Sequence, residues 1–411
     1  MVMPSVRVQA FFNLAASGGS YLTLNSTAGK GKLNNAAAIL AGDIATDISD
    51  DVTRINIRRG RDSQLFADMP AGRWTVQLDN QDRTYDPLYA SSPYVGNIVP
   101  GKRVQITANG VSIADGSVED WNFEFGPTEL STAFMECADA LAQLAAAEFD
   151  EWTTTAGETA GPRITAVLDR PEVNYTLNRD IGTGISTLQA DTVSWGSNVL
   201  NYVNLVAASD LGWLYASRTG SVTFEDRHTN LNATAAVAFA DNGTALPFTA
   251  ISVAYGSEKL FNRIGIDRVG GTKQTANDTA SQSTYRVRSL TQSGLLLDSD
   301  TQAADMATYL LGIYAAPELR ISSLTCELAI LSEAEQNSIL SLDITSLVQV
   351  TFTPNSVGSA IVRTCIVEGI SHDITPGSHV VTLSLGDTDR RSFVRLDDTI
   401  FGKLDTGVLA F

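Results

Sequence analysis

The chain has 411 residues, of which 44% are hydrophobic and 18% charged. This length exceeds the size at which one hydrophobic core keeps growing, so we expect two or three domains. The formal net charge of -18 disfavours a nucleic-acid-binding face, because such a face needs a cluster of basic residues that the sequence lacks. The sequence also has no stretch approaching the roughly 18 consecutive apolar residues of a membrane span.

Residues 1–125 are predicted to form a first β domain. Short runs in which apolar and polar residues alternate, such as VTRINIRRG at 52–60 and VSIADGSVEDWNFEF at 111–125, are separated by turn residues. Asn109-Gly110 lies between two such runs and is a strong hairpin signal. A barrel or a sandwich would account for this pattern.

Residues 126–250 are predicted to be a mixed α/β region. The segment 131–150 places apolar residues three or four positions apart, which predicts one helix with Ser131 as its N-cap. A second helix is predicted over 196–212, with Gly212 as its left-handed stop. A hairpin with its turn at Thr219-Gly220 should follow.

Residues 251–390 return to alternation and predict a second β domain with one helix. That helix is expected at 299–319, capped by Ser299 or Asp300 and closed by Pro317. The last segment, 391–411, is too short for a domain and is interpreted as a C-terminal arm. Its apolar end at Phe411 is expected to dock on a neighbour, because an exposed Phe would be a liability.

Two histidines are the main candidates for a metal site. His372 and His379 flank a predicted strand turn and could face one another, with Asp373 nearby as a carboxylate ligand. No HExxH or equivalent motif supports a metal, so surface strand histidines are the favoured interpretation. Cysteines 137, 326 and 365 lie far apart and are expected to be buried reduced thiols, the first on a helix.

No catalytic signature occurs in the sequence, and we expect no cofactor. There is no GxSxG motif and no phosphate loop, and GTGIST at 182–187 lacks the terminal Gly-Lys of such a loop. A hydrolase that uses only two carboxylates cannot be recognised by motif and stays open as an alternative. The prediction is that the chain is not an enzyme.

The acidic stretch LDNQDRTYDPLYASSPY at 78–94 is predicted to be a loop of turns. A calcium loop is disfavoured because Arg83 would occupy the third ligand position after Asp79 and Gln81, and because the central Gly and the terminal Glu are missing. Asp79 is expected to close a β-turn, and Pro87 after Asp86 ends the strand because proline cannot donate to a ladder.

This stretch belongs to an ordered series of short motifs. They are Arg59-Gly60-Arg61, Ala71-Gly72, Leu78-Asp79-Asn80, Asp86-Pro87, Ser92-Pro93-Tyr94 and Pro100-Gly101-Lys102. The series resembles the N-terminal domain of minor tail proteins of long-tailed bacteriophages, the tail-tip hub proteins related to the central hub of contractile-phage baseplates. Later segments resemble the same family less closely, so the resemblance covers nearly the whole chain.

The resemblance implies a structural protein of the virion, made in the bacterial cytoplasm and placed at the tail tip. It implies a homotrimer in which each copy supplies two similar β-barrels, so that three copies match a sixfold tail tube above and present threefold symmetry to fibre or receptor-binding proteins below. It also implies transient passage of phage DNA without sequence-specific binding. Candidate assembly residues are Arg59, Arg61, Arg83, Asp86, Tyr94 and Phe411.

Two other functions remain open from the sequence. One is a module that binds a receptor or carbohydrate through loops around Trp152 and Asn174. The other is a cell-wall hydrolase with an acidic pair. Many hub proteins carry a long C-terminal extension for such tasks, and this chain ends some twenty residues after its second β domain.

Overall fold

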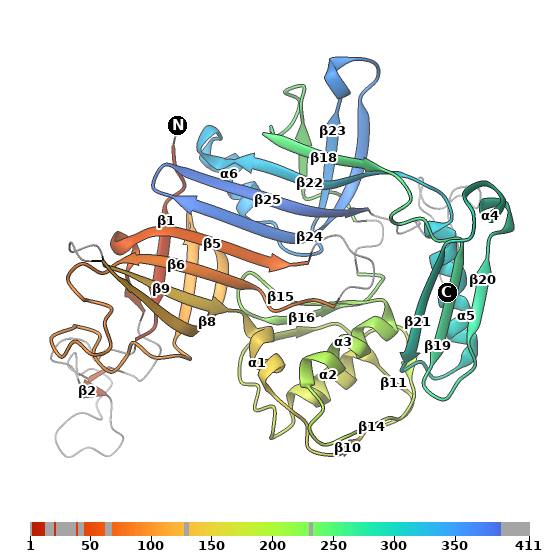
Figure 1. The fold of residues 1–411 in the computed structure, drawn as a ribbon, viewed down its shortest axis with the longest axis horizontal. Helices are drawn as coiled ribbons and strands as arrows, with labels where there is room; N and C mark the ends of the chain where they lie inside the picture. Colours follow the sequence, from red (N-terminus) through yellow and green to blue (C-terminus); the bar gives the residue numbers. More distant parts are fainter. Residues whose placement is uncertain are drawn as a thin grey trace.

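The computed structural model describes residues 2–12, 20–21, 38–39, 45–61, 68–126, 131–229 and 233–387. The predicted arm at 391–411, including Phe411, lies outside the described residues. Figure 1 shows a long curved sheet, a region with three helices below it, and a smaller unit of strands and helices at one side.

The first β region forms one half of the long sheet. Its strands are β1 (Val6–Ala10), β4 (Thr46–Asp47), β5 (Val52–Gly60), β6 (Arg73–Asp79), β7 (Arg103–Ala108), β8 (Val111–Phe125) and β9 (Ser131–Ala138). Along β7 every second residue is buried, as expected for a strand with one face on a core. The predicted hairpin turn is confirmed, because Asn109 and Gly110 both have positive φ and join β7 to β8.

The second β region forms the other half of the same sheet. Its strands are β17 (Val237–Ala240), β18 (Ala250–Tyr255), β22 (Leu319–Glu327), β23 (Leu347–Phe352), β24 (Ile361–Thr375) and β25 (Ser378–Asp387). The hairpin of β23 and β24 projects from the sheet at the top of Figure 1. Outside the long sheet, β2 (Ser20–Tyr21) pairs with β3 (Ala38–Ile39).

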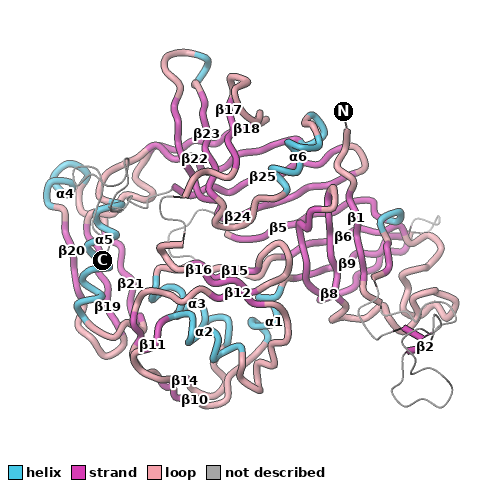
Figure 2. The backbone as a smooth tube through the Cα atoms, turned by 180° about the vertical axis from the view of Figure 1, so that it is seen from behind, coloured by secondary structure: helices cyan, strands magenta, loops and turns pink. Residues whose placement is uncertain are grey.

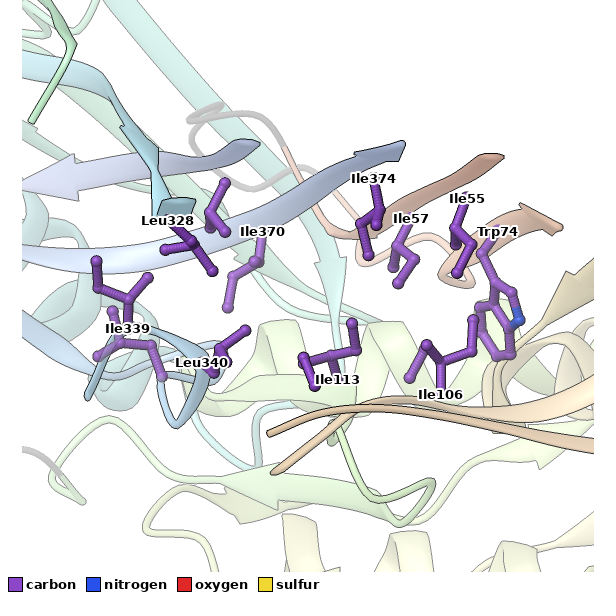
Figure 3. Close-up of a cluster of buried hydrophobic side chains, with 14 of the residues drawn as sticks. Ile55, Ile57, Trp74, Ile106, Ile113, Leu328, Ile339, Leu340, Ile370 and Ile374 are labelled. Atoms are coloured by element: carbon purple, nitrogen blue, oxygen red, sulfur yellow. The ribbon is translucent and has the colours of Figure 1, made fainter. Parts of the chain in front are cut away.

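The two halves meet where β5 pairs with β24. The pairing is antiparallel and runs from Gly60 opposite Gly369 to Ile55 opposite Ile374. One hydrophobic cluster contains side chains from both halves, and Figure 3 shows Ile55 and Ile57 beside Ile374 within it. The mainly β fold with a mixed α/β insertion is confirmed. The described strands form one open 13-stranded sheet, however, from which β23 and β17 branch at β24, and not two closed barrels.

The helix predicted over 131–150 is wrong in its first part. Residues 131–138 are strand β9, which pairs with β6 and β8 and buries Ala133, Met135 and Cys137. The helix α1 (Ala140–Ala146) begins only after Asp139, whose side chain accepts a hydrogen bond from the backbone of Leu141. A strand followed at once by a helix mimicked the spacing of one long helix. Cysteines 137, 326 and 365 are buried thiols as expected, but all three lie on strands.

The middle region has its own hydrophobic core below the sheet. It contains α1, α2 (Ala160–Leu168) and α3 (Val199–Asp210), with the short strands β10 (Trp152–Thr153), β11 (Glu158–Thr159), β12 (Arg179–Ile181), β13 (Thr187–Leu188), β14 (Thr192–Val193), β15 (Trp213–Ala216) and β16 (Val222–Glu225). The predicted second helix is therefore confirmed as α3, and the hairpin turn at Gly220 joins β15 to β16.

The end of α3 differs from the prediction. Leu211 and not Gly212 takes the left-handed conformation, with φ of 54°. Gly212 is required for a different reason, because a Cβ atom there would lie 2.5 Å from the ring of Phe224. The amide of Gly212 still donates to the carbonyl oxygen of Ala207 at the helix end, but the missing side chain serves the close approach to β16 and not a left-handed turn.

A third unit has a core of its own and packs beside the middle region. It consists of β19 (Arg263–Arg268), β20 (Gln274–Asn277), α4 (Thr279–Tyr285), β21 (Ser289–Leu295) and α5 (Asp300–Tyr314). Helix α5 is the predicted one, and Ser299 caps it. Neither α4 nor α6 (Glu333–Leu340) was predicted from the sequence, and the short 3-10 helices are η1 (Ser49–Asp51), η2 (Leu328–Ile330) and η3 (Pro354–Ser356). Figure 2 shows α5 lying along the sheet of this unit.

Candidate functional site

Arg59 lies at the junction of the long sheet and the middle region. Its side chain is only 3% exposed, and it donates to the carbonyl oxygen of Ala216 at 2.8 Å. It also forms an ion pair with Asp343 at 2.6 Å. A guanidinium group that donates to acceptors in two other parts of the chain ties these parts to the end of β5. Arg59 is thus placed inside the chain, and its role between copies stays a prediction.

Arg61 follows the end of β5 and contacts the seam between β5 and β24. It forms an ion pair with Glu368 at 3.4 Å, and its guanidinium lies 4.4 Å from the ring centre of Trp213. Glu368 is the extra residue at a register shift of β24. Val367 before it lies opposite Leu385 of β25, and Gly369 after it lies opposite the next residue, Ser384. The described contacts of Arg61 therefore stabilise a bend in β24 where the two halves of the sheet meet.

The loop at 80–97 is built from turns that recur every three residues. The backbone amides of Arg83, Asp86, Tyr89, Ser92 and Val95 each donate to the carbonyl oxygen three residues earlier. The prediction that the acidic stretch at 78–94 is a loop of turns is confirmed. Because its backbone donors find partners within the loop, the loop has a defined shape without regular secondary structure.

Arg83 and Asp86 contact each other inside this loop. The guanidinium donates two hydrogen bonds to one carboxylate oxygen, at 2.9 and 2.6 Å, and lies over the ring of Tyr89. Burial alone would raise the pKa of Asp86, but hydrogen bonds from the backbone amide of Leu88 and from Arg83 hold this pKa below its ordinary value. The Arg83 side chain is half exposed and Asp86 is buried, so Arg83 is the one that a partner could reach.

Tyr94 belongs to a row of aromatic rings that leads from the core to the surface. Its ring centre lies 4.7 Å from that of Phe12 and 5.5 Å from that of Tyr85. The row continues along β8 through Trp121, Phe123 and Phe125, which are alternate residues on one face of the strand. Its last member, Phe125, is 62% exposed.

Other apolar side chains are exposed near this end of the sheet. In the turn loop and its continuation, Leu88 is 88% exposed, and Val95 and Val99 are also exposed. These three exposed apolar side chains stand on one loop of fixed shape, which makes the loop a candidate contact surface. The structure brings Arg83 and Tyr94 to this surface, whereas Arg59 and Arg61 lie at the seam.

His372 and His379 face one another across the hairpin of β24 and β25, as the sequence allowed. Nδ1 of His372 lies 3.0 Å from Nε2 of His379, and both side chains are buried. The favoured interpretation as surface histidines is wrong, because both rings point into the sheet core. Asp373 points to the opposite face, where it pairs with Arg54, and the described residues contain no group of three or more His, Cys, Asp or Glu that could hold a metal.

Burial controls the titration of this pair. Burial and the neighbouring His379 place the pKa of His372 well below its ordinary value. Burial lowers the pKa of His379 to about 4, although the charge of Glu327 opposes this shift. The two imidazoles are therefore neutral at pH 7 and share one hydrogen bond.

The alternative site for a receptor or carbohydrate, predicted around Trp152 and Asn174, lies in the middle region. Trp152 is half-buried, with its ring 4.9 Å from the guanidinium of Arg170. Asn174 is exposed and has a φ of 47°. Trp195 lies on a turn two residues after Val193, which is paired with Trp152, and is 75% exposed. Within the described ranges no helix is long and apolar enough to cross a membrane.

Sequence reasoning missed Asp343 and Glu368. Both are single acidic residues among mainly apolar neighbours, and only the folded chain shows that they meet Arg59 and Arg61. The partners are 284 residues apart for Arg59 and Asp343, so no local pattern could have paired them.

Comparison with solved structures identifies the fold. The 43 kDa tail protein of prophage MuSo2 from Shewanella oneidensis is 14% identical and superposes with a TM-score of 0.58, covering 94% of this chain and 97% of the other. A tail protein from Neisseria meningitidis MC58 is 11% identical, with a TM-score of 0.57 and the same coverages. No protein-family model and no curated protein sequence matches the chain. At the level of the fold the resemblance seen in the sequence is confirmed: this chain has the fold of these tail proteins.

Proposed function

We propose that the protein is a structural component of a phage tail, a hub at the tail tip. In this role it is a homotrimer that joins the sixfold tail tube to the host-binding tip. The observation that carries the proposal is a likeness to two tail proteins that extends over 94% of the chain, together with the ordered motifs at 59–102. The protein would act through its surfaces and not as an enzyme.

The two halves of the long sheet support a ring of this kind. Each half contributes its own set of strands, so that three copies would present six such sets to a sixfold tube. The exposed apolar side chains at 88–99 and Phe125 offer a surface for neighbouring proteins.

Passage of DNA is the second part of the proposal. A channel lined by carboxylates would repel the phosphate backbone and let the DNA slide, and the net charge of -18 supports such a lining. A structure of the trimer in which most Asp and Glu side chains lie outside the channel would refute this part alone.

Symmetry-resolved imaging of the phage particle tests the main proposal. We expect three copies at the tail tip, between the tube and the fibres. Density for the protein in the capsid, or six copies or one copy at the tip, would overturn it. Clearing of peptidoglycan by the purified protein would instead support the hydrolase, and blocking of phage adsorption would support the receptor-binding module.

A further inference from the structure

Two asparagines of the chain are followed directly by glycine, Asn109 and Asn242. Both pairs lie in short loops between strands, and both glycines have a positive φ, 77° at Gly110 and 78° at Gly243. An asparagine before glycine is chemically reactive, because the next backbone nitrogen can attack the side-chain amide and glycine has no Cβ to hinder the approach. The two pairs differ in how the fold holds the asparagine side chain.

The side chain of Asn109 is fixed between two other parts of the chain. Its Oδ1 accepts a hydrogen bond from the backbone amide of Ser5 at 2.8 Å, and its Nδ2 donates to Oε1 of Gln336 at 2.9 Å. Gln336 is fully buried. Turning the Asn109 amide towards Gly110 would break both bonds and take the donor away from a buried oxygen, which is costly. The fold therefore protects this pair.

The side chain of Asn242 is held only by its own turn. It lies in the loop between β17 and β18, where β17 pairs with β23 of the projecting hairpin (Figure 2), and both Asn242 and Gly243 are exposed. Its Oδ1 accepts two hydrogen bonds from Thr244, one from the backbone amide at 3.1 Å and one from Oγ1 at 2.6 Å. Among the described residues, Nδ2 of Asn242 and the backbone amide of Gly243 have no hydrogen-bond partner.

This turn prepares the attack on the side-chain amide. The hydrogen bond from the Thr244 amide to Oδ1 closes an Asx turn, which folds Cγ of Asn242 back over the peptide bond that contains the nitrogen of Gly243. Both donors of Thr244 point at Oδ1, the atom that gains negative charge when the nitrogen attacks Cγ. A Cβ atom added at Gly243 would meet nothing within 4 Å, so water reaches this peptide bond. Reacting groups that are held together in this way react faster than free ones.

We propose that Asn242-Gly243 is a site of self-modification, at which the folded chain converts Asn242 to aspartate and isoaspartate. The nitrogen of Gly243 attacks Cγ of Asn242, so that a bond between nitrogen and Cγ forms and the bond between Cγ and Nδ2 breaks. The proton of the Gly243 amide passes through water to Nδ2, which leaves as ammonia. A second water molecule then opens the succinimide ring at either carbonyl group, and this step gives aspartate or isoaspartate.

The product changes a loop that closes against the projecting hairpin. Backbone hydrogen bonds join Ala240 to Leu246 and Leu246 to Ala238 at the base of the loop, at 2.9 and 3.1 Å. Asp241 accepts a hydrogen bond from the amide of Thr353, directly after β23, at 2.6 Å. Conversion places a second carboxylate beside Asp241, and isoaspartate also adds a methylene group to the backbone. The loop thus gains negative charge with the age of the protein, whether or not the protein acts in a phage tail.

Peptide mapping by mass spectrometry tests the proposal on the purified full-length protein. The protein is kept in slightly alkaline buffer, and the conversion of each asparagine is followed by the mass difference between an amide and a carboxylate. Enzymatic methylation detects isoaspartate separately. We expect Asn242 to convert at least about tenfold faster than Asn109, whose amide must first give up its two hydrogen bonds. In urea, where the fold is lost, the two asparagines should convert at similar rates.

Two variants test the part that the turn plays. Gly243→Ala should slow the conversion about tenfold, because alanine hinders the nitrogen and disfavours the left-handed backbone. Thr244→Val keeps the backbone donor but removes the hydroxyl donor, and it should slow the conversion about threefold. An unchanged rate in Thr244→Val would overturn the role of the hydroxyl group.

A synthetic peptide of residues 238–247 provides the control without the fold. If the turn prepares the attack, the folded protein should convert Asn242 at least as fast as the peptide does. Slower conversion in the protein than in the peptide would overturn the proposal, and so would equal rates at Asn109 and Asn242 in the folded protein.

Discussion

At the residue scale, Arg59 connects more parts of the chain than any pattern in its own strand suggests. It is buried, and its ion pair with Asp343 links the end of β5 to the turn before β23. Replacing Arg59 with Met leaves a carboxylate without its partner in a site that is only 20% exposed. We expect a loss of about 3 kcal/mol in the free energy of unfolding, measured by urea denaturation.

The matched control for this change lies on the same strand. Arg54 forms an ion pair with Asp373 in which both side chains are about half exposed. Arg54→Met should cost less than about 1 kcal/mol, because solvent screens exposed pairs. Equal losses in the two variants would show that burial of the Arg59 pair does not matter.

The two buried histidines predict a dependence of stability on pH. Both have a folded-state pKa below the ordinary value of 6.5, and that of His379 is about 4. Between pH 6.5 and pH 4 the unfolded chain binds more protons than the folded chain. The contribution of the histidines to the free energy of unfolding is therefore complete above pH 6.5 and is lost as the pH falls towards 4. Urea denaturation across this range should show lower stability at lower pH.

The variant His372→Gln/His379→Gln isolates this effect. Asp139 acts in the opposite direction, because burial raises its pKa to about 6, and its contribution is present at low pH and lost as the pH rises through 6. Since Asp139 is unchanged in the variant, the difference between wild type and variant reports the histidines. A difference that is constant across the pH range would contradict the prediction.

At the element scale, the seam between β5 and β24 depends on close approach of two backbones. Gly60 has a φ of 81°, and a Cβ atom at this position would lie 2.3 Å from the carbonyl oxygen of Glu368. Gly60→Ala should therefore cost about 2–4 kcal/mol, from the left-handed backbone and from crowding together. Thermal and urea unfolding would measure the loss.

Gly110 provides the control, because it has nearly the same backbone conformation without the crowding. Its φ is 77°, and a Cβ atom added there would meet nothing within 4 Å. Gly110→Ala should cost about 1–2 kcal/mol, the left-handed penalty alone. If both substitutions cost the same, the close contact at the seam contributes nothing.

The elements also show how far the sequence could be interpreted without the structure. Strands such as β7 were predictable because alternation and a turn signal mark them locally, and α5 because Ser299 and Pro317 mark its ends. The strand β9 was not predictable, because its buried residues Ala133 and Cys137 are followed directly by apolar residues with the helical spacing of α1. Local periodicity cannot separate two elements that follow without a turn.

The candidate site was predictable only in part. The motif order located the turn loop and hence Arg83 and Tyr94, but burial of Arg59 depends on contacts with residues far along the chain. Strands β8 and β24 resemble each other, since both have 15 residues and both have a register shift after a Val, but this likeness was out of reach because it lies in strand order and register. Apart from Val-Glu at the shift, the side chains at matching positions differ, as Trp121 and Ile370 do.

At the scale of the whole molecule, the two halves of the sheet share one hydrophobic cluster, whereas the middle region and the third unit have their own. Because the halves bury side chains against each other, we expect them to unfold in one transition and not in two. Differential scanning calorimetry of wild type and Gly60→Ala tests this. A seam variant that splits the transition of the sheet into two would show that the halves are independent.

The pairing of β5 with β24 also constrains the order of synthesis and folding. Gly60 and Gly369 face each other, so β5 leaves the ribosome long before the strand that completes its edge has been made. Contacts between residues so far apart in sequence are slow to form, and an unpaired strand edge is prone to aggregate in the interval. Shortened chains that stop before β24 should therefore accumulate as aggregates in the producing cell, and we expect the full chain to need chaperones during translation because both halves of the sheet lie in one chain.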